Sequence, residues 1–488
     1  MIRYVAFYTL LFCVPGACAS AADAFDRKPW LEDYAYLKHA LEREDANLAW
    51  FASAAGGLDL PALDRRTQRA LASAADEADA KAALLGFIGA FHGHTAALPA
   101  LAPAVKSAEP PRLDFAGLDA AAGCAALGFG STKSVAFSLP FESLPGFTLV
   151  ADGSARSFRT GVASAGGKRL GLLRIPYFRP AEYLEPCLGG WRDAAAATAD
   201  PAKLKERLAL RVYATVAERL AELARRGVDV LVVDVGGNSG GDDMGEFLTR
   251  LFTTRNVQSA RLMMTAGPVA TAYLDERVGD LKRALQGGDG ELARSAEHAI
   301  AGFEARKRAV EARRCDMAWV WRERRPWNPA GCSRLVDVGY ASGALDDVAP
   351  TSAGDLAQAL YWPAVVDAWR GAWSGPVYVL TNGQTYSSAE MFTARMRDNG
   401  VARTVGTATG GDGCGFMQDD VPIVLPHSRL RFRAPDCVRL RADGTDEVAG
   451  IAPDVPIAPT DGESPRARAA RALEAIAADF AHSKAPSN

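Results

Sequence analysis

Ser387 is the first candidate for chemistry because it lies where an apolar run meets a helical pattern. Residues 377–380 predict a buried strand, residues 388–399 predict a helix, and residues 401–405 predict a second strand. The S-x-x-E motif at 387–390 is typical of a capping box, which satisfies free N–H groups at a helix start. The same junction would also suit a nucleophile, because the free N–H groups and the helix dipole stabilise a developing oxyanion. Taken alone, the serine favours the cap.

A glycine cluster and two histidines are the other candidate groups. The cluster G-G-N-S-G-G at 236–241 follows the apolar run 228–235, and its backbone N–H groups could approach a ligand closely. It lacks the lysine and hydroxyl residue of a P-loop, and a tight turn is the alternative interpretation. His92 and His94 lie at the end of a helical pattern, where a histidine also suits the helix dipole.

Several longer patterns indicate the elements that must position these groups. Trp30 begins an i, i+4, i+7, i+11 stripe of apolar residues that predicts an amphipathic helix. A second helix is expected over residues 64–91, after Pro61 interrupts the pattern. Residues 168–178 predict a strand, and residues 201–226 predict a long helix. The nearly continuous apolar run 228–235 is typical of a central strand that is buried on both faces.

The alternation of strands and helices indicates an α/β protein with more than one part. We expect a signal peptide at 1–21, an N-terminal helical domain at 22–100, and a small β-rich or irregular module at 101–167. The core is predicted over 168–256 and 374–488. Residues 257–373 are predicted to form a helical insertion that contains a disulfide-linked loop. This insertion would act as a lid over the site or form solvated surface.

Composition excludes several classes of partner. The chain has 488 residues, of which 49% are hydrophobic and 23% are charged, as in a soluble globular protein. The net charge of -3 gives no indication of a nucleic-acid partner. No spacing typical of zinc ligands is present, so we expect neither a metal nor another cofactor. The oligomeric state stays open.

The N-terminus has the layout of a secretory signal peptide. Arg3 precedes a mostly apolar run over residues 4–17, and small residues allow cleavage after Ala19 or Ala21. The run is too short for a comfortable membrane span. Lipidation of Cys18 is the alternative and would give the only membrane contact. We therefore expect an exported protein, either periplasmic or secreted.

Six cysteines remain after removal of the signal peptide, an even number in a chain expected to reach an oxidising compartment. Up to three disulfides are therefore expected. Local spacing favours one of the several connectivities that six cysteines allow, namely Cys315–Cys332, Cys414–Cys437 and Cys124–Cys187.

Six motifs follow one another along the chain: G-H-T at His94, G-x-x-R-I-P-x-F at 171–178, D-x-x-x-N-x-G-G at 234–241, S-x-x-E at 387–390, V-G-x-x-T at 405–409, and E-x-x-G-x-x-P-D at 447–454. Their order resembles that of the C-terminal processing (tail-specific) peptidases, a serine peptidase family that includes the tricorn core protease. No single motif is specific, but together they span about three quarters of the chain.

The resemblance implies a ClpP/crotonase-like core, a central sheet with flanking helices, and serine peptidase activity. Many members pair the serine with a lysine 25 residues further along, but this chain has Asp412 there. A carboxylate is a poor substitute for a neutral lysine base, so the sequence excludes that branch. The short stretch before Gly171 leaves little room for the PDZ domain that many members carry.

The tricorn-like branch instead implies a Ser-His-Glu triad. Ser387 is then the nucleophile, His94 the base, with His92 as the alternative, and Glu447 the residue that orients the imidazole. The oxyanion hole is expected from the N–H groups of Ser388 and Gly240. Gly237 and Gly241 are equally able to donate.

These roles predict an endopeptidase that hydrolyses protein or peptide substrates through an acyl-enzyme. Two alternatives remain open. The chain could bind hydrophobic ligands or peptides without cleaving them, as some relatives do, or it could act as a serine esterase.

Overall fold

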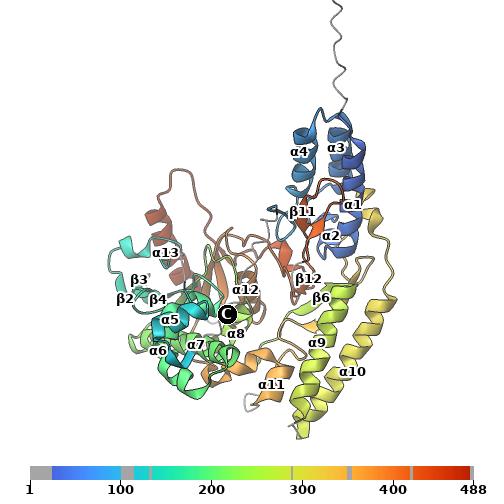
Figure 1. The fold of residues 1–488 in the computed structure, drawn as a ribbon. Coiled ribbons are helices and arrows are strands. Elements are labelled where there is room, and N and C mark those ends of the chain that lie inside the picture. Colours follow the sequence, from blue (N-terminus) through green and yellow to red (C-terminus); the bar gives the residue numbers. More distant parts are fainter. Residues whose placement is uncertain are drawn as a thin grey trace, which may run out of the picture.

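The computed structural model describes residues 25–100, 115–130, 134–286, 290–348, 354–417 and 421–483. The predicted signal peptide at 1–21 lies outside these residues. The described part is a mixed α/β structure, as the sequence predicts: a central sheet with helices on both faces, joined to an N-terminal group of helices (Figure 1).

The central sheet has seven strands in the order β13-β9-β8-β5-β4-β3-β2. The strands from β13 to β4 pair in parallel, whereas β3 and β2 add antiparallel at one edge. The strands are β2 (Thr148–Ala151), β3 (Thr160–Ala165), β4 (Lys168–Arg174), β5 (Val230–Asp234), β8 (Val377–Thr381), β9 (Arg403–Gly406) and β13 (Val455–Pro456).

Strand β5 lies at the centre and is buried along its whole length, which confirms the prediction from its apolar run. Leu231 and Val233 face a cluster formed with α7 (Pro201–Arg225) and α12 (Ser388–Asp398). Val230 and Val232 face the opposite cluster, formed with α13 (Pro465–Ser483). Alternating apolar residues thus fill both layers, because successive side chains of a strand point to opposite faces.

The N-terminal helices are α1 (Lys28–Glu44), α2 (Leu48–Phe51), α3 (Leu60–Ser73) and α4 (Glu77–Ile88). The single helix predicted over residues 64–91 is wrong, because the chain leaves the helical conformation at Ala74 and restarts after Asp76. The Asp76 carboxylate accepts the Asp79 N–H at 2.9 Å and so caps the new helix. Pro61 lies in the first turn of α3, where a missing N–H costs nothing.

A second sheet holds part of the residues between β5 and β8. Its order is β12-β6-β7, and its strands are β6 (Arg261–Thr265), β7 (Leu335–Tyr340) and β12 (Cys437–Leu440). Two long helices, α9 (Pro268–Leu285) and α10 (Gly290–Ala312), pack against it. The loop between Cys315 and Cys332 instead buries Trp319 and Trp321 among the N-terminal helices.

A third sheet has the order β1-β11-β10, with β1 (Ala96–Leu98), β10 (Ile423–Val424) and β11 (Arg431–Arg433). It joins the end of the N-terminal helical region to a segment far along the chain. The remaining elements are short: η1 (Phe115–Gly117), α5 (Ala120–Ala126), η2 (Phe141–Ser143), η3 (Pro180–Glu182), α6 (Leu184–Ala197), α8 (Met244–Leu248), η4 (Thr249–Phe252), η5 (Met317–Trp321), α11 (Asp355–Leu360), η6 (Trp362–Trp369) and η7 (Glu447–Ala449).

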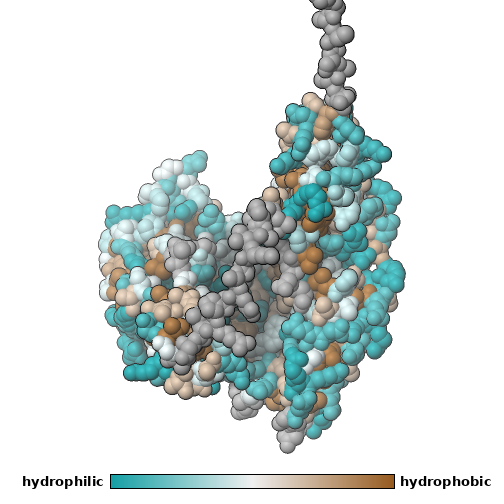
Figure 2. All heavy atoms as spheres, viewed as in Figure 1, coloured by the Kyte–Doolittle hydropathy of each residue, from teal (hydrophilic) through white to brown (hydrophobic). Residues whose placement is uncertain are grey.

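All three predicted disulfides are present: Cys124–Cys187, Cys315–Cys332 and Cys414–Cys437. Figure 2 shows a surface hollowed between the lobe built on the seven-stranded sheet and the lobe that holds the N-terminal helices and α9–α10. None of the helices in the described ranges combines the length and the apolar character that crossing a bilayer requires.

Candidate active site

Ser387 occupies a strained turn between strand β8 and helix α12. Its φ of 52° and ψ of -119° place it in a region that side chains with a Cβ rarely adopt. The predicted capping box with Glu390 is present, and the Ser387 N–H donates to Glu390 Oε2 at 3.1 Å. A simple cap has no need of this backbone conformation, since Ncap residues ordinarily have extended φ and ψ. Strain of this kind is typical of functional positions.

The turn before Ser387 is fixed by strand β5 and the loop that follows it. The Thr385 hydroxyl donates to the carbonyl of Val235 at 3.2 Å, and the Tyr386 N–H donates to the carbonyl of Asn238 at 2.9 Å. Adjacent parallel strands end at the same edge of the sheet, so the segments after β5 and β8 meet there. The glycine cluster is thereby brought to Ser387.

Gly240 lies directly against the serine. A Cβ at this position would be only 2.7 Å from the Cβ of Ser387, and the residue has a φ of +91°, so only glycine fits. Its N–H donates to Asn238 Oδ1 at 2.8 Å, and the Gly237 N–H donates to Asn382 Oδ1 at 2.9 Å. The Gly240 N–H is therefore engaged within the loop, and the Gly237 N–H is engaged by the turn after β8.

Gly241 and Ser388 offer the remaining N–H groups. The Phe178 N–H donates to the carbonyl of Gly240 at 3.0 Å, and the Asp242 N–H donates to that of Phe178 at 2.7 Å. In a parallel bridge of this form the Gly241 N–H points away from Phe178. The Ser388 hydroxyl donates to the carbonyl of Asp242 at 2.5 Å, which holds the glycine loop against the start of α12.

The Glu390 carboxylate holds together the turn at Ser387 and the loop that follows β9. It accepts the Thr409 hydroxyl at 2.6 Å in addition to the Ser387 N–H. The three backbone N–H groups of residues 411–413 donate to the same carboxylate at 2.7, 2.8 and 3.1 Å. Burial raises the pKa of Glu390, although each of these donors opposes that rise. One side chain thus fixes both loops.

Asp412, on that loop, contacts His94. Its Oδ2 lies 3.0 Å from His94 Nε2, but the alignment does not make a hydrogen bond. Burial lowers the pKa of His94 to about 4, with help from Arg433 and Arg439, so the imidazole is neutral at pH 7. Burial raises the pKa of Asp412 to about 6. A neutral imidazole is the form that can accept a proton from serine.

His94 is held from both sides along the chain. Helix α4 precedes it, and strand β1, which begins two residues later, pairs with β11. The neighbouring Thr95 hydroxyl donates to Asp45 Oδ2 at 2.8 Å. His92, the alternative base, is exposed, and its Nδ1 lies 3.0 Å from the carbonyl of Gly411. Both histidines therefore reach the 411–415 loop, and His94 is the more enclosed.

Glu447 is fully buried on η7, where its Oε2 accepts a hydrogen bond from Arg439 Nε at 2.6 Å. Its other oxygen, Oε1, has no hydrogen-bond partner in the described part of the chain. Burial raises the pKa of Glu447 to about 7, and Arg439 opposes that rise. Arg439 also donates to the carbonyl of Gly413 at 2.9 Å and to that of Ser387 at 3.3 Å.

The structure thus brings Ser387, Ser388 and Gly240 into contact, and places His94 against Asp412 and Glu447 against Arg439. The contacts of Asp412 and Arg439 are not predicted by the sequence, where Asp412 stands out only because it replaces a lysine and Arg439 lies in no motif. The contact of Glu390 with Ser387 is predicted by the capping box, but its contacts with residues 409–413 are not.

The Cys414–Cys437 disulfide should matter for both stability and turnover. It ties the loop that carries Asp412 to strand β12, which carries Arg439. We expect the Cys414→Ala/Cys437→Ala variant to lose about 3 kcal/mol of unfolding free energy in urea titrations. Its kcat should also fall, since the loop beside His94 is released.

The Cys315→Ala/Cys332→Ala variant is the matched control. It opens a loop of similar length that packs against the N-terminal helices. A comparable loss of stability with normal kcat is expected. An equal fall of kcat in both variants would show that general destabilisation, not the loop, lowers turnover.

Comparison with known proteins identifies the family and the fold of this chain. The model of peptidase family S41 matches residues 169–457. Mature CPAF has a similar fold, with a TM-score of 0.52 and 15% identity over 92% of this chain and 96% of CPAF. Mature CPAF complexed with lactacystin gives a TM-score of 0.52 and 16% identity over 93% and 98% of the two chains. No curated protein matches the sequence.

Proposed function

This chain belongs to peptidase family S41 and is a serine-type peptidase, and we propose that it is an exported endopeptidase with Ser387 as nucleophile. The strained backbone of Ser387, with the glycine loop packed against it, carries this proposal. A serine at such a strand-to-helix turn presents its hydroxyl at the edge of the sheet, beside free N–H groups.

The reaction is acyl transfer. Ser387 Oγ attacks the peptide carbonyl while His94 accepts its proton, which gives a tetrahedral intermediate. His94 then donates this proton to the amine, the C–N bond breaks, and the acyl-enzyme remains. Water deprotonated by His94 attacks the ester and releases the carboxylic acid and Ser387. No other reactant is consumed.

The oxyanion of both intermediates is held by backbone N–H groups. Ser388 supplies one of them at the start of α12. We assign the second to Gly241 in preference to Gly240, because the Gly240 N–H already donates to Asn238. Each such donor contributes about 3 kcal/mol to transition-state stabilisation. The Ser388–Asp242 hydrogen bond keeps the two donors at a fixed separation.

Glu447 is the proposed third member of the triad. Its Oε1 and His94 Nε2 are both buried without a hydrogen-bond partner in the described residues. Buried polar atoms of this kind ordinarily find partners, so each indicates a contact made during the reaction. Glu447 Oε1 would accept one imidazole N–H, while the other imidazole nitrogen accepts the proton of the Ser387 hydroxyl. Asp412 holds the ring in the resting protein.

Export is part of the proposal because two independent features favour it. The six cysteines of the described region form three disulfides, which persist in oxidising compartments. The predicted signal peptide at 1–21 precedes them in the sequence.

The test is labelling of the disulfide-intact protein with a fluorophosphonate, followed by peptide mass mapping. We expect the label on Ser387 and its loss in the His94→Ala variant. The His92→Ala variant is the matched control and should still be labelled. Label that persists without His94 would overturn its role as base.

Two outcomes would replace the peptidase proposal. A labelled Ser387 that cleaves esters but no peptide in a mixed library would indicate a serine esterase. A protein that takes no label and hydrolyses nothing would indicate a ligand-binding member of the family. Lactacystin, with which mature CPAF has been complexed, is a second probe of the same serine.

A further inference from the structure

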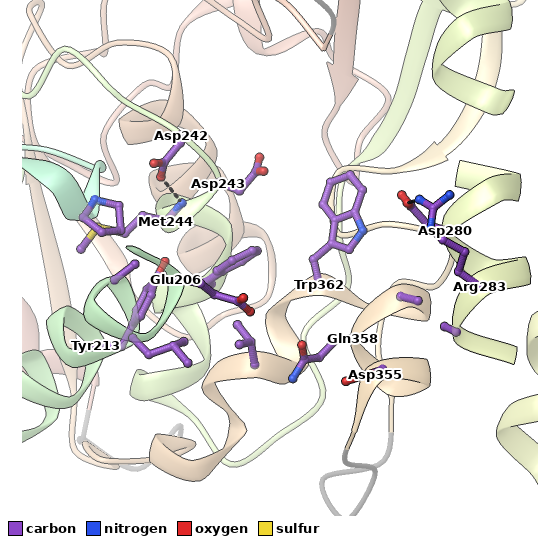
Figure 3. Close-up of a pocket in the computed structure, with 17 residues that line it drawn as sticks. Glu206, Tyr213, Asp242, Asp243, Met244, Asp280, Arg283, Asp355, Gln358 and Trp362 are labelled. Carbon is purple, nitrogen blue, oxygen red and sulfur yellow. Dashed lines mark hydrogen bonds and ion pairs between the residues drawn. The ribbon is translucent and has the colours of Figure 1, made fainter. Parts of the chain in front are cut away.

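A cavity of about 710 Å³ lies beside the glycine loop. One wall comes from α7 and from the start of α8, and the facing wall comes from α9, α11 and η6 (Figure 3). Apolar side chains form much of both walls, among them Leu210, Phe247, Trp362 and Val365. Such walls suit a long alkyl stem.

The polar groups of the cavity are mainly acidic. Its lining includes five carboxylates and one guanidinium, that of Arg283: the carboxylates belong to Glu206, Asp242, Asp243, Asp280 and Asp355. Asp280 is paired with Arg277 and Arg283. The other four make no ion pair within the described ranges. Arg179 and Lys205 act on Asp242, and Arg439 and Arg277 act on Asp243, only from beyond ion-pair distance, so the lining itself is net negative.

Tyr213 gives a second, independent indication of a ligand. The residue is only 4% exposed and lines the cavity, yet its hydroxyl has no hydrogen-bond partner among the described residues. Asp242 and Asp243 lie close enough to raise the pKa of its phenol further, beyond the effect of burial. A hydroxyl on the cavity lining that makes no hydrogen bond to the described residues can accept one from a bound group.

A cation on a long stem would match this lining. The described residues contain no group of three or more His, Cys, Asp and Glu placed to share a metal ion. The carboxylates lie around a space whose walls are partly apolar. Figure 3 shows Glu206, Asp242 and Asp243 on one side and Trp362, Gln358 and Asp355 across from them. Lysine and arginine combine an alkyl stem with a charged end.

The cavity also adjoins the proposed catalytic groups. Asp242, on its lining, is next to Gly241, and its carbonyl accepts the Ser388 hydroxyl at 2.5 Å. A peptide whose carbonyl lies on the Ser388 and Gly241 N–H groups would therefore direct a neighbouring side chain toward Asp242 and Asp243. Burial, Asp242 and Glu246 raise the pKa of Asp243 to about 6, and Arg439 and Arg277 oppose that rise.

We propose that this cavity binds the lysine or arginine side chain of a peptide substrate next to the scissile bond, an assignment that rests on the proposed function. The ammonium or guanidinium pairs with Asp242 and Asp243 and donates to the Tyr213 hydroxyl. The alkyl stem lies along Phe247 and Trp362. The chain thereby prefers basic residues over neutral ones of the same length.

The test compares two quenched fluorescent peptides that differ only in lysine or norleucine at one position, with the cleaved bond identified by mass spectrometry. We expect kcat/KM to be about 10-fold to 100-fold higher for the lysine peptide. The ratio should fall toward one in Asp243→Asn, whose side chain does not cap α8. Glu206→Gln is a second variant, in case the first does not fold.

Glu474→Gln is the matched control, since it removes one exposed charge on α13, across the sheet from the cavity. It should keep the wild-type ratio. Equal kcat/KM for both peptides, with Ser387 still labelled by the fluorophosphonate, would overturn the cavity assignment and leave the proposed function intact.

If Ser387 takes no label, the proposed function is wrong. The cavity assignment is then tested by peptide binding instead of by cleavage. Calorimetry with the Ser387→Ala protein and the same peptides should show about 10-fold tighter binding of the lysine peptide, lost in Asp243→Asn. Equal affinities would overturn the assignment there as well.

Discussion

The Ser387→Ala variant is expected to lose peptide hydrolysis by a factor of about 10⁴ to 10⁶ in kcat. The remaining groups can still bind the peptide and hold an oxyanion, but no nucleophile forms the acyl-enzyme. Steady-state kinetics with a quenched fluorescent peptide measure the loss. Removal of the cap hydroxyl should cost only about 1 kcal/mol of unfolding free energy.

Two further variants separate catalysis from stability. Asp59 caps α3, and its carboxylate accepts the Ala62 N–H at 2.8 Å. The Asp59→Ala variant should therefore lose a similar amount of unfolding free energy while its kcat stays normal. Ser387→Gly should be equally inactive yet about 1 kcal/mol more stable than Ser387→Ala, because glycine adopts a φ of 52° without strain. Turnover that survives in either Ser387 variant would exclude this serine as nucleophile.

Glu447→Gln is expected to lower kcat by about 10³-fold, because a neutral amide cannot stabilise the imidazolium that forms on His94. In the proposed triad the Glu447 carboxylate accepts an imidazole N–H, so its replacement should also lower the pKa of His94. The acid limb of the pH–rate profile therefore moves to lower pH. Asp412→Asn should cost less than about 10-fold, since Asp412 contacts the ring without a hydrogen bond.

The Glu447→Gln variant also leaves Arg439 without its carboxylate, and a buried unpaired charge is destabilising. Arg439→Lys is the control for this effect, since it disturbs the same ion pair but keeps Glu447. Its kcat should fall by about 10-fold at most. If Asp412→Asn is instead the more damaging change, Asp412 is the carboxylate that orients His94.

Local patterns in the sequence predict most of the core. The apolar run of β5, the strand and helix around Ser387, and α7 all lie where their periodicity places them, because their own side chains form the contacts that stabilise them. The break between α3 and α4 was missed although Asp76, with acidic residues in the following turn, is an N-cap signal. Alanines on both sides continue the helical pattern, so the pattern alone does not show the break.

The site is less predictable because its contacts join distant segments. Asp412 and Arg439 have no periodic or motif signal, and their partners are set by how loops meet at the sheet edge. Such pairings depend on tertiary geometry, which local propensity does not encode. The bond from the Gly240 N–H to Asn238 Oδ1 is different, because it joins residues two positions apart and belongs to a local turn.

The two proposed catalytic groups, Ser387 and His94, come from different parts of the fold, and this has a consequence for synthesis. His94 comes from the N-terminal helices, but strand β1 beside it pairs with β11, and Asn47 donates to Asp446 at 2.9 Å. Both partners belong to the last fifth of the chain. Under the proposed mechanism a nascent chain therefore has no base beside its serine. It cannot hydrolyse proteins of the cell that makes it until its C-terminal residues have been synthesised and have packed against the N-terminal helices.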